Sequence, residues 1–240
     1  MKYKNIVFDL YGTLIDIHTD EHSDQTWSLF AEYLRTFNID CNMKTLRDLF
    51  FSYDKIYREK PSIYIEPEIE ILDVFDQIFR EQGHPLSREK LSQIGYQFRC
   101  ISREYIRLYD GVINLLALLH ESNCNVYLLS NAQSCFTRPE LFMFHLEEYF
   151  DRIIISSEHG CMKPDPSFFN LLFQNQLENL DRKDWVMIGD SIGCDVMGAA
   201  SIGMDSILLC NDLEPNQQLP SQCIAVVKEQ NRMKLIDFLF

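Results

Sequence analysis

The sequence predicts an α/β protein in which a parallel sheet with helices on both faces carries an inserted, all-helical second domain. Three observations predict it. Short apolar runs that are typical of buried strands alternate with helical patterns. Several of these runs end abruptly on acidic or small polar residues. The first run is separated from the others by a long segment, residues 17–109, in which apolar residues recur at helical spacing.

The predicted strands are short and apolar. The first, beginning at Ile6, ends on Asp9, and a glycine and a hydroxyl residue follow within four positions. The other predicted strands are Asn125–Leu129, Arg152–Ile155, Trp185–Ile188, Asp205–Leu209 and Cys223–Val227. Helical patterns at 112–119 and 166–173 separate some of them, and the second begins with Pro and Ser, as helix starts do.

The segment between the first strand and the rest is predicted to be a helical cap without a strand. Its apolar residues recur at helical spacing around Trp27, Leu46 and Ile69, and Ser87 is expected to cap a helix that runs through Arg99. The predicted division is therefore a discontinuous core, residues 1–16 and 108–240, and a cap, residues 17–107.

Composition restricts the class of partner. The net charge of −14 argues against a nucleic acid or an anionic membrane, because both require a basic patch. No apolar run approaches the length of a membrane span. The eight cysteines are scattered, with no C-x-x-C pair and no signal peptide, which indicates reduced thiols in a cytoplasmic protein. A small-molecule substrate is the partner that we expect.

Four strand-end features occur in a fixed order along the chain. They are Asp9 with Thr13, then Ser130, then Lys163, and finally Asp190 with Asp195. In a doubly wound sheet the carboxyl ends of the strands meet at one edge, so these features should converge. Taken one at a time, each residue has an ordinary structural explanation, such as a turn carboxylate or a solvated lysine. Their joint order favours a functional site.

The acidic residues of this set have defined chemical roles. Asp9 is the predicted nucleophile, and its second oxygen can bind a metal together with Asp190. Asp195 is expected to bind the metal's water or to hold Lys163. Lys163 would neutralise the carboxylates and the charge that develops during reaction. Mg²⁺ is the predicted cofactor, because it prefers oxygen ligands and because the carboxylates would otherwise repel one another.

Hydroxyl groups supply the expected substrate contacts. The hydroxyls of Thr13 and Ser130, with nearby backbone amides, can donate hydrogen bonds to a phosphate.

The arginines and aromatic residues of the cap are more often surface or core residues than ligand contacts. The sequence does not distinguish which of them faces the site.

These residues resemble the motifs of the haloacid dehalogenase superfamily of hydrolases. The matching segments are Asp9–Leu14, Leu129–Asn131, Lys163–Pro166 and Gly189–Asp195, and small residues in 196–204 also match. The resemblance implies a Rossmann-like core and a helical cap that closes over the substrate and excludes water. It also implies a substrate-binding role for Ser130 and Asn131, and a metal ligand in the main-chain carbonyl of Tyr11.

Tyr11 is also where the chain departs from the family's phosphatases. Most of them carry a second Asp two residues after the nucleophile, which acts as the acid and base. Tyr11 occupies that catalytic position here. A phenol with a pKa of about 10 is a poor proton donor and acceptor near neutral pH.

Tyrosine at this position resembles the 2-haloacid dehalogenase branch, which displaces halide without a metal. Two other positions oppose that assignment. Dehalogenases typically have Ser where this chain has Asp190, and Tyr where it has Phe169.

Three hypotheses follow. The favoured one is a Mg²⁺-dependent phosphohydrolase that acts on a small phosphorylated metabolite through an aspartyl-phosphate on Asp9. It should prefer acyl or aryl phosphates, whose leaving groups need little protonation. The alternatives are a metal-independent 2-haloacid dehalogenase that uses Asp9, and a catalytically weak binding protein on the same fold.

Overall fold

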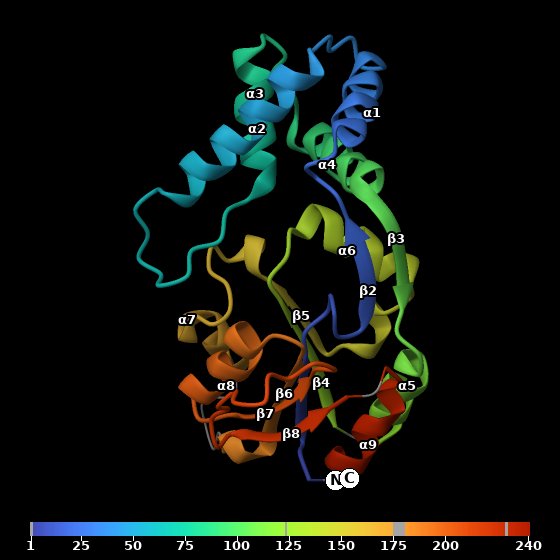
Figure 1. Ribbon diagram of the computed structural model, residues 1–240, viewed down its shortest axis with the longest axis vertical. Helices are drawn as coiled ribbons and strands as arrows, with labels where there is room; N and C mark the ends of the chain where they lie inside the picture. The colour runs from blue at the N-terminus through green and yellow to red at the C-terminus, as the bar shows by residue number, and fades with distance from the viewer. Residues whose placement is uncertain (1, 123, 175–180, 229) are drawn as a thin grey trace.

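A six-stranded parallel sheet forms the centre of the core, and a helical cap stands over the carboxyl ends of its strands (Figure 1). The structure is a computed structural model that describes residues 2–122, 124–174, 181–228 and 230–240. The strand order is β5-β4-β1-β6-β7-β8, and all neighbouring strands are parallel. The strands are β1 (Asn5–Phe8), β4 (Asn125–Ser130), β5 (Arg152–Ile155), β6 (Trp185–Gly189), β7 (Asp205–Leu209) and β8 (Cys223–Val227). All six predicted strands are thus confirmed.

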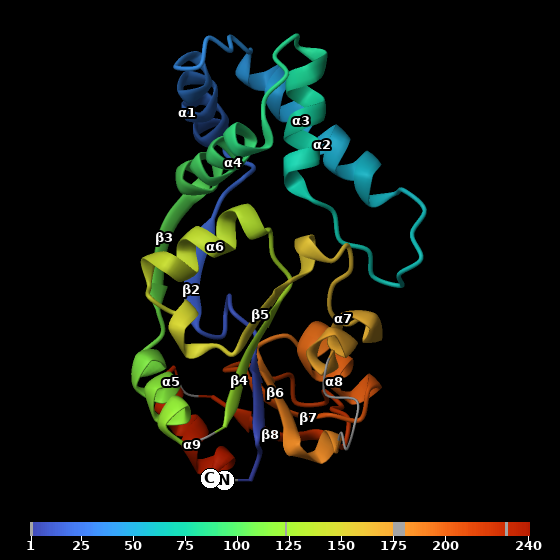
Figure 2. The ribbon, with the colours of Figure 1, turned by 180° about the vertical axis from the view of Figure 1, so that it is seen from behind.

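Alternating side chains of these strands pack on opposite faces of the sheet. Ile6 and Phe8 of β1 belong to one buried cluster, and Val7 belongs to another. Apolar residues on both faces are the pattern that a parallel sheet covered on both sides requires. Figure 2 shows α5, α6 and α9 on one side and α7 and α8 on the other.

The core helices are short. They are α5 (Val112–Glu121), α6 (Ser134–Met143), α7 (Pro166–Asn170), α8 (Met197–Ser201) and α9 (Ile236–Leu239). The 3₁₀ turns are Glu147–Tyr149, Ser156–Glu158, Leu171–Phe173, Arg182–Asp184 and Arg232–Leu235, and Ile192–Val196 forms a π-helix. The first and last described residues of the chain lie close together, where the Lys2 amide donates to the Leu239 carbonyl (Figure 1).

The cap contains α1 (Asp24–Arg35), α2 (Met43–Arg58), α3 (Ile71–Glu81) and α4 (Arg88–Ser102). Their inward faces form one aromatic cluster around Trp27, which is fully buried against Phe30, Phe50 and Phe98. The Ser87 hydroxyl accepts a hydrogen bond from the Lys90 amide, so the predicted N-cap of α4 is confirmed.

The expectation that residues 17–109 contain no strand is wrong. β2 (Ile15–Thr19) and β3 (Arg103–Leu108) pair in antiparallel register and form a two-stranded ribbon between core and cap (Figure 1). The ribbon runs across both predicted boundaries, 16/17 and 107/108. Its strands are only partly buried, so they lack the continuous apolar runs by which the core strands were predicted.

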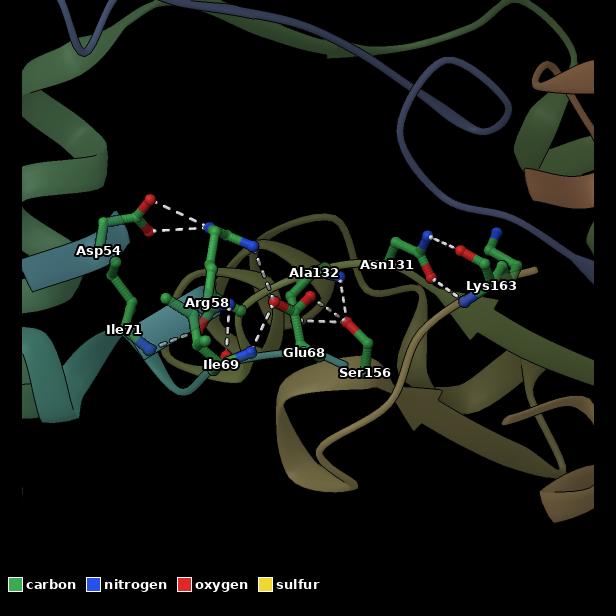
Figure 3. A network of polar contacts seen from close by, with 10 residues as sticks. Asp54, Arg58, Glu68, Ile69, Ile71, Asn131, Ala132, Ser156 and Lys163 are labelled. Atoms are coloured by element: carbon green, nitrogen blue, oxygen red, sulfur yellow. Dashed lines mark hydrogen bonds and ion pairs between the residues drawn. The ribbon is translucent and has the colours of Figure 1, made fainter. Parts of the chain in front are cut away.

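The segment before α3 attaches the cap to the core at a second place. Pro67 forms an antiparallel bridge with Cys161, the Met162 amide donates to the Glu66 carbonyl, and the Glu68 amide donates to the Gly160 carbonyl. The Ser156 hydroxyl donates to the Glu68 carboxylate at 2.8 Å (Figure 3). This cap segment therefore lies directly against the core loop that leads to Lys163.

Two further features bear on the sequence predictions. Among the described residues no helix is both long and apolar enough to cross a membrane. All eight cysteines are free thiols, as expected.

Candidate active site

Polar residues at the ends of three adjacent central strands meet at one edge of the sheet. Asp9 follows β1, which lies between β4 and β6. Ser130 ends β4, and Asp190 follows β6. The amide of Asp9 donates to the Ile188 carbonyl of β6 at 2.9 Å, which fixes the backbone of Asp9 at the strand end. The predicted convergence of these strand ends is thus confirmed.

Lys163 lies between two of the carboxylates. Its ammonium donates to Oδ1 of Asp9 at 2.7 Å and to Oδ1 of Asp195 at 2.6 Å, and all three side chains are almost completely buried. Burial opposes the charge on Lys163, but Asp195 and Asp9 outweigh it and raise the lysine pKa. Of the two roles expected for Asp195, the structure shows the contact with Lys163, and the binding of a metal's water stays a prediction.

Three carboxylates share this site with one ammonium group. Ligand oxygens of Asp9, Asp190 and Asp195 all lie within 4.8 Å of one another. Burial raises the pKa of Asp9, and the charges of Asp195 and Asp190 raise it further, against the effect of Lys163. Burial and Asp195 also raise the pKa of Asp190. The surplus of negative charge and the all-oxygen ligand set fit a hard divalent cation such as Mg²⁺.

Two glycines allow the acidic groups to come this close. Gly12 has a φ of +82°, and a Cβ at this position would lie 2.2 Å from Oδ2 of Asp190. A Cβ on Gly189 would lie 2.2 Å from Oδ2 of Asp195. Both positions must therefore lack a Cβ for the carboxylates of Asp190 and Asp195 to occupy their places.

Thr13 and Ser130 are placed as donors without an acceptor. Both side chains are buried, and neither hydroxyl has a hydrogen-bond partner among the described residues. Buried polar groups are normally satisfied, so two buried hydroxyls without a partner near the acidic cluster indicate that a ligand completes them. The arrangement suits a bound oxyanion.

Asn131 has a structural contact instead of a free amide. Its amide nitrogen donates to the Lys163 carbonyl at 2.9 Å, and its side-chain oxygen accepts from the Lys163 amide at 2.7 Å (Figure 3). This bidentate contact holds the main chain of the residue whose ammonium reaches Asp9. In this arrangement Asn131 positions Lys163, while its substrate-binding role stays a prediction.

The phenol of Tyr11 is held by groups on two helices. It donates to Oε2 of Glu140 at 2.5 Å and lies 3.1 Å from the Thr137 hydroxyl, both on α6. The guanidinium of Arg99, on cap helix α4, lies 5.1 Å from the centre of the ring. Burial and the Glu140 charge raise the pKa of Tyr11 above its ordinary value. The phenol is thus even less suited to proton transfer than the sequence indicated.

The sequence reasoning missed two residues that shape the site. Arg232 is buried, and it donates to the carbonyls of Thr13 at 2.7 Å and Gly12 at 3.2 Å. Glu140 is completely buried at the end of the Tyr11 side chain. The only local signal for Glu140 is a single acidic residue beside apolar neighbours in α6, and Arg232 has none.

Comparison with known proteins places the chain in a family. The family model described as haloacid dehalogenase-like hydrolase matches residues 3–203, which include every candidate site residue except Arg232. The pyrimidine 5'-nucleotidase PynA of Streptococcus pneumoniae is 26% identical over 208 residues, covering 86% of this chain and 84% of the relative. A glyceraldehyde 3-phosphate phosphatase of Pyrococcus abyssi is 22% identical over 204 residues, covering 85% and 80%.

Solved structures share the fold. The HAD-hydrolase YfnB of Bacillus subtilis, in a crystal form bound to magnesium, has a TM-score of 0.57 at 19% identity and covers 100% of this chain and 99% of its own. A 2-haloacid dehalogenase from Pseudomonas syringae has a TM-score of 0.63 at 16% identity, covering 98% of both chains. The extent of the family match, together with the four motifs at the strand ends, shows that this chain is an enzyme of the haloacid dehalogenase-like hydrolase family.

Proposed function

We propose that this hydrolase removes phosphate from a small phosphorylated metabolite, with Asp9 as the nucleophile and Mg²⁺ as the cofactor. The observation that carries the proposal is the group of three carboxylates around one lysine. Displacement of halide from carbon needs a nucleophilic carboxylate but no cation, so Asp190 beside Asp9 would only add repulsion. A phosphoryl group with its own negative charge needs the cation.

The reaction would proceed in two displacements at phosphorus. A carboxylate oxygen of Asp9 attacks, the bond between phosphorus and the leaving oxygen breaks, and its electron pair stays with the leaving group. Water then attacks the phosphorus of the aspartyl-phosphate, which releases inorganic phosphate and restores the Asp9 carboxylate. Thr13 and Ser130 donate their free hydroxyls to the transferred phosphoryl oxygens.

Asp9, Asp190 and the Tyr11 carbonyl would hold the metal, with Asp195 binding its water. When bound, Mg²⁺ neutralises phosphoryl charge during transfer. Lys163 keeps Asp9 oriented and offsets the negative charge of the cluster through its contacts with Asp9 and Asp195. The magnesium in the crystals of YfnB, a protein with the same fold, supports this choice of ion.

The leaving group is expected to be one that departs without a proton. The Tyr11 hydroxyl donates its hydrogen to Glu140, so the same hydrogen is not available to a leaving oxygen. Acyl and aryl phosphates meet this requirement, because their leaving groups are weak bases. The relatives named as a nucleotidase and a phosphatase support a phosphorylated substrate.

The proposal is tested with p-nitrophenyl phosphate and Mg²⁺. Hydrolysis should disappear with EDTA, return with added Mg²⁺, and be absent in Asp9→Asn. The matched control is Asp184→Asn, which changes a carboxylate in the exposed ion pair with Lys4 and should keep full activity. Hydrolysis that survives EDTA or Asp9→Asn would rule out the proposed route.

A second candidate rests on Tyr11. If p-nitrophenyl phosphate is not hydrolysed, chloride release from 2-chloropropionate in the presence of EDTA would identify a dehalogenase. Absence of both activities would leave the binding-protein hypothesis. A phosphate-mimicking fluoride that becomes trapped on Asp9 would contradict that hypothesis.

A further inference from the structure

Glu140 brings together three separate parts of the chain inside the protein. It lies on core helix α6 with no exposed side-chain surface. Tyr11, on the loop that follows the nucleophile, donates to its Oε2 at 2.5 Å. Arg99 of cap helix α4 donates to its Oε1 at 3.0 Å, and Arg103 at the start of β3 lies 3.4 Å from the same oxygen.

The ring of Tyr11 takes part in the same contact. The guanidinium of Arg99 lies 5.1 Å from the ring centre of Tyr11 and 5.6 Å from that of Phe136, which lies in the first turn of α6. A planar guanidinium is suited to contact aromatic faces while it donates to a carboxylate. Tyr11, Arg99 and Glu140 therefore contact one another pairwise, so displacement of one disturbs the other two.

Stability alone does not explain a buried carboxylate with two arginines. Removing charged groups from water is costly, and apolar residues of similar volume often stabilise a protein as well or better. The cluster instead has a specific geometry, because each partner comes from a different element. Such a contact can define one arrangement of these elements.

We propose that Glu140 is a positioning residue for the reaction: through Tyr11 it fixes the loop beside Asp9, and through Arg99 and Arg103 it fixes the cap over that loop. This proposal rests on the proposed function for its catalytic consequence. Tyr11 is two residues from the nucleophile, and its carbonyl is an expected metal ligand. A rotation of its side chain would therefore shift the main chain where the reaction occurs.

Two variants separate the parts of this contact. Tyr11→Phe removes only the hydroxyl and leaves the carboxylate with its arginines. Glu140→Gln keeps the shape but removes the charge that both arginines face. In each variant kcat for p-nitrophenyl phosphate should fall. For Glu140→Gln we expect a decrease of about 10–100-fold, because small displacements of reacting groups have effects of that size. KM should change much less, because the hydroxyls that bind the phosphate are untouched.

The double variant tests whether Glu140 acts through Tyr11. If it does, Tyr11→Phe combined with Glu140→Gln should lower kcat no further than Glu140→Gln alone. Multiplication of the two separate effects would overturn the inference. The matched control is Glu158→Gln, which breaks the exposed pair between Glu158 and Arg138 of the same helix α6 and should leave kcat unchanged.

Hydrogen–deuterium exchange gives a readout that needs no substrate. In Glu140→Gln, amides of residues 10–15 and of α4 should both exchange faster than in the wild type, while those of β7 keep their rates. Uniformly faster exchange, or a lower unfolding temperature with unchanged kcat, would show that Glu140 is only a structural residue. Because exchange is measured without substrate, failure of the phosphatase assay on wild-type protein would refute the proposed function without affecting this test.

Discussion

Lys163 donates its ammonium to Oδ1 of Asp9 at 2.7 Å, although these residues are 154 positions apart in the chain. The lysine is 2% exposed and the aspartate side chain 10% exposed. The pair lies at the centre of an acidic cluster, because Asp195 contacts the same ammonium. Lys163 is therefore the cation that directly contacts the two buried carboxylates of the site.

Replacement of that lysine should make folding depend on metal. In Lys163→Met the buried carboxylates lose their counter-charge, and breaking a buried ion pair typically costs about 3–5 kcal/mol. We expect a lower melting temperature than in the wild type, and a larger increase of that temperature on addition of Mg²⁺. Thermal unfolding with and without Mg²⁺ measures both effects. An equal shift by Mg²⁺ in the two proteins would contradict this account of the charge balance.

The affinity for Mg²⁺ should increase with pH. Burial and the neighbouring carboxylates raise the pKa of Asp9 in the metal-free protein, so a proton competes with the metal at low pH. As the pH rises through this raised pKa the proton leaves, and the dissociation constant for Mg²⁺ should decrease. Calorimetric titration at about pH 6 and about pH 8 tests the direction. In Asp9→Asn the dependence on pH should be weaker, because one competing site is gone.

Arg232 should be required for the shape of the first-motif loop. Its guanidinium donates to the carbonyls of Gly12 and Thr13 and lies 3.9 Å from the centre of the Tyr109 ring. Arg232→Met leaves two carbonyls without these donors, which should lower the free energy of unfolding by about 1–3 kcal/mol. It should also reduce kcat. Lys228→Met, which removes an exposed positive charge four residues away, is the control. Full activity in Arg232→Met would show that the loop keeps its shape without the arginine.

Tyr11→Asp should change the preference for leaving groups. A carboxyl at this position can protonate an alkoxide, whereas the phenol donates to Glu140. We expect the ratio of turnover on an alkyl phosphate to turnover on p-nitrophenyl phosphate to increase. The absolute rate of this variant should be reduced, because the hydrogen bond from Tyr11 to Glu140 is lost. An unchanged ratio would count against the acid/base explanation.

Local patterns were sufficient to predict the core sheet. The four central strands β4, β1, β6 and β7 are largely buried, so their sequences are apolar runs, and a run such as Trp185–Gly189 ends where the backbone reaches the polar edge of the sheet. Asp9 and Asp190 could be predicted as neighbours because parallel strands present their carboxyl ends at one edge. The match of Lys163 and Asp195 to the ordered motifs then completed the acidic cluster.

Three features depended on contacts that no local pattern reports. The β2–β3 ribbon is partly exposed, so its strands show no apolar run and depend on pairing between residues about ninety positions apart. Glu140 meets Tyr11 across 129 positions, and Arg232 meets Thr13 across 219. Their roles follow from where distant segments pack together.

The sequence by itself determined the α/β core, the helical cap and the identity of the acidic cluster, because burial and chemistry restrict the residue types at those positions. Only the tertiary structure decided what the side chains of Tyr11 and Asn131 contact. Only it revealed Glu140 beside Tyr11, and Arg232 beside the carbonyls of Gly12 and Thr13. The physical reason is that a hydrogen bond depends on distances and directions in space. A side chain such as that of Tyr11 has several possible partners until packing selects one.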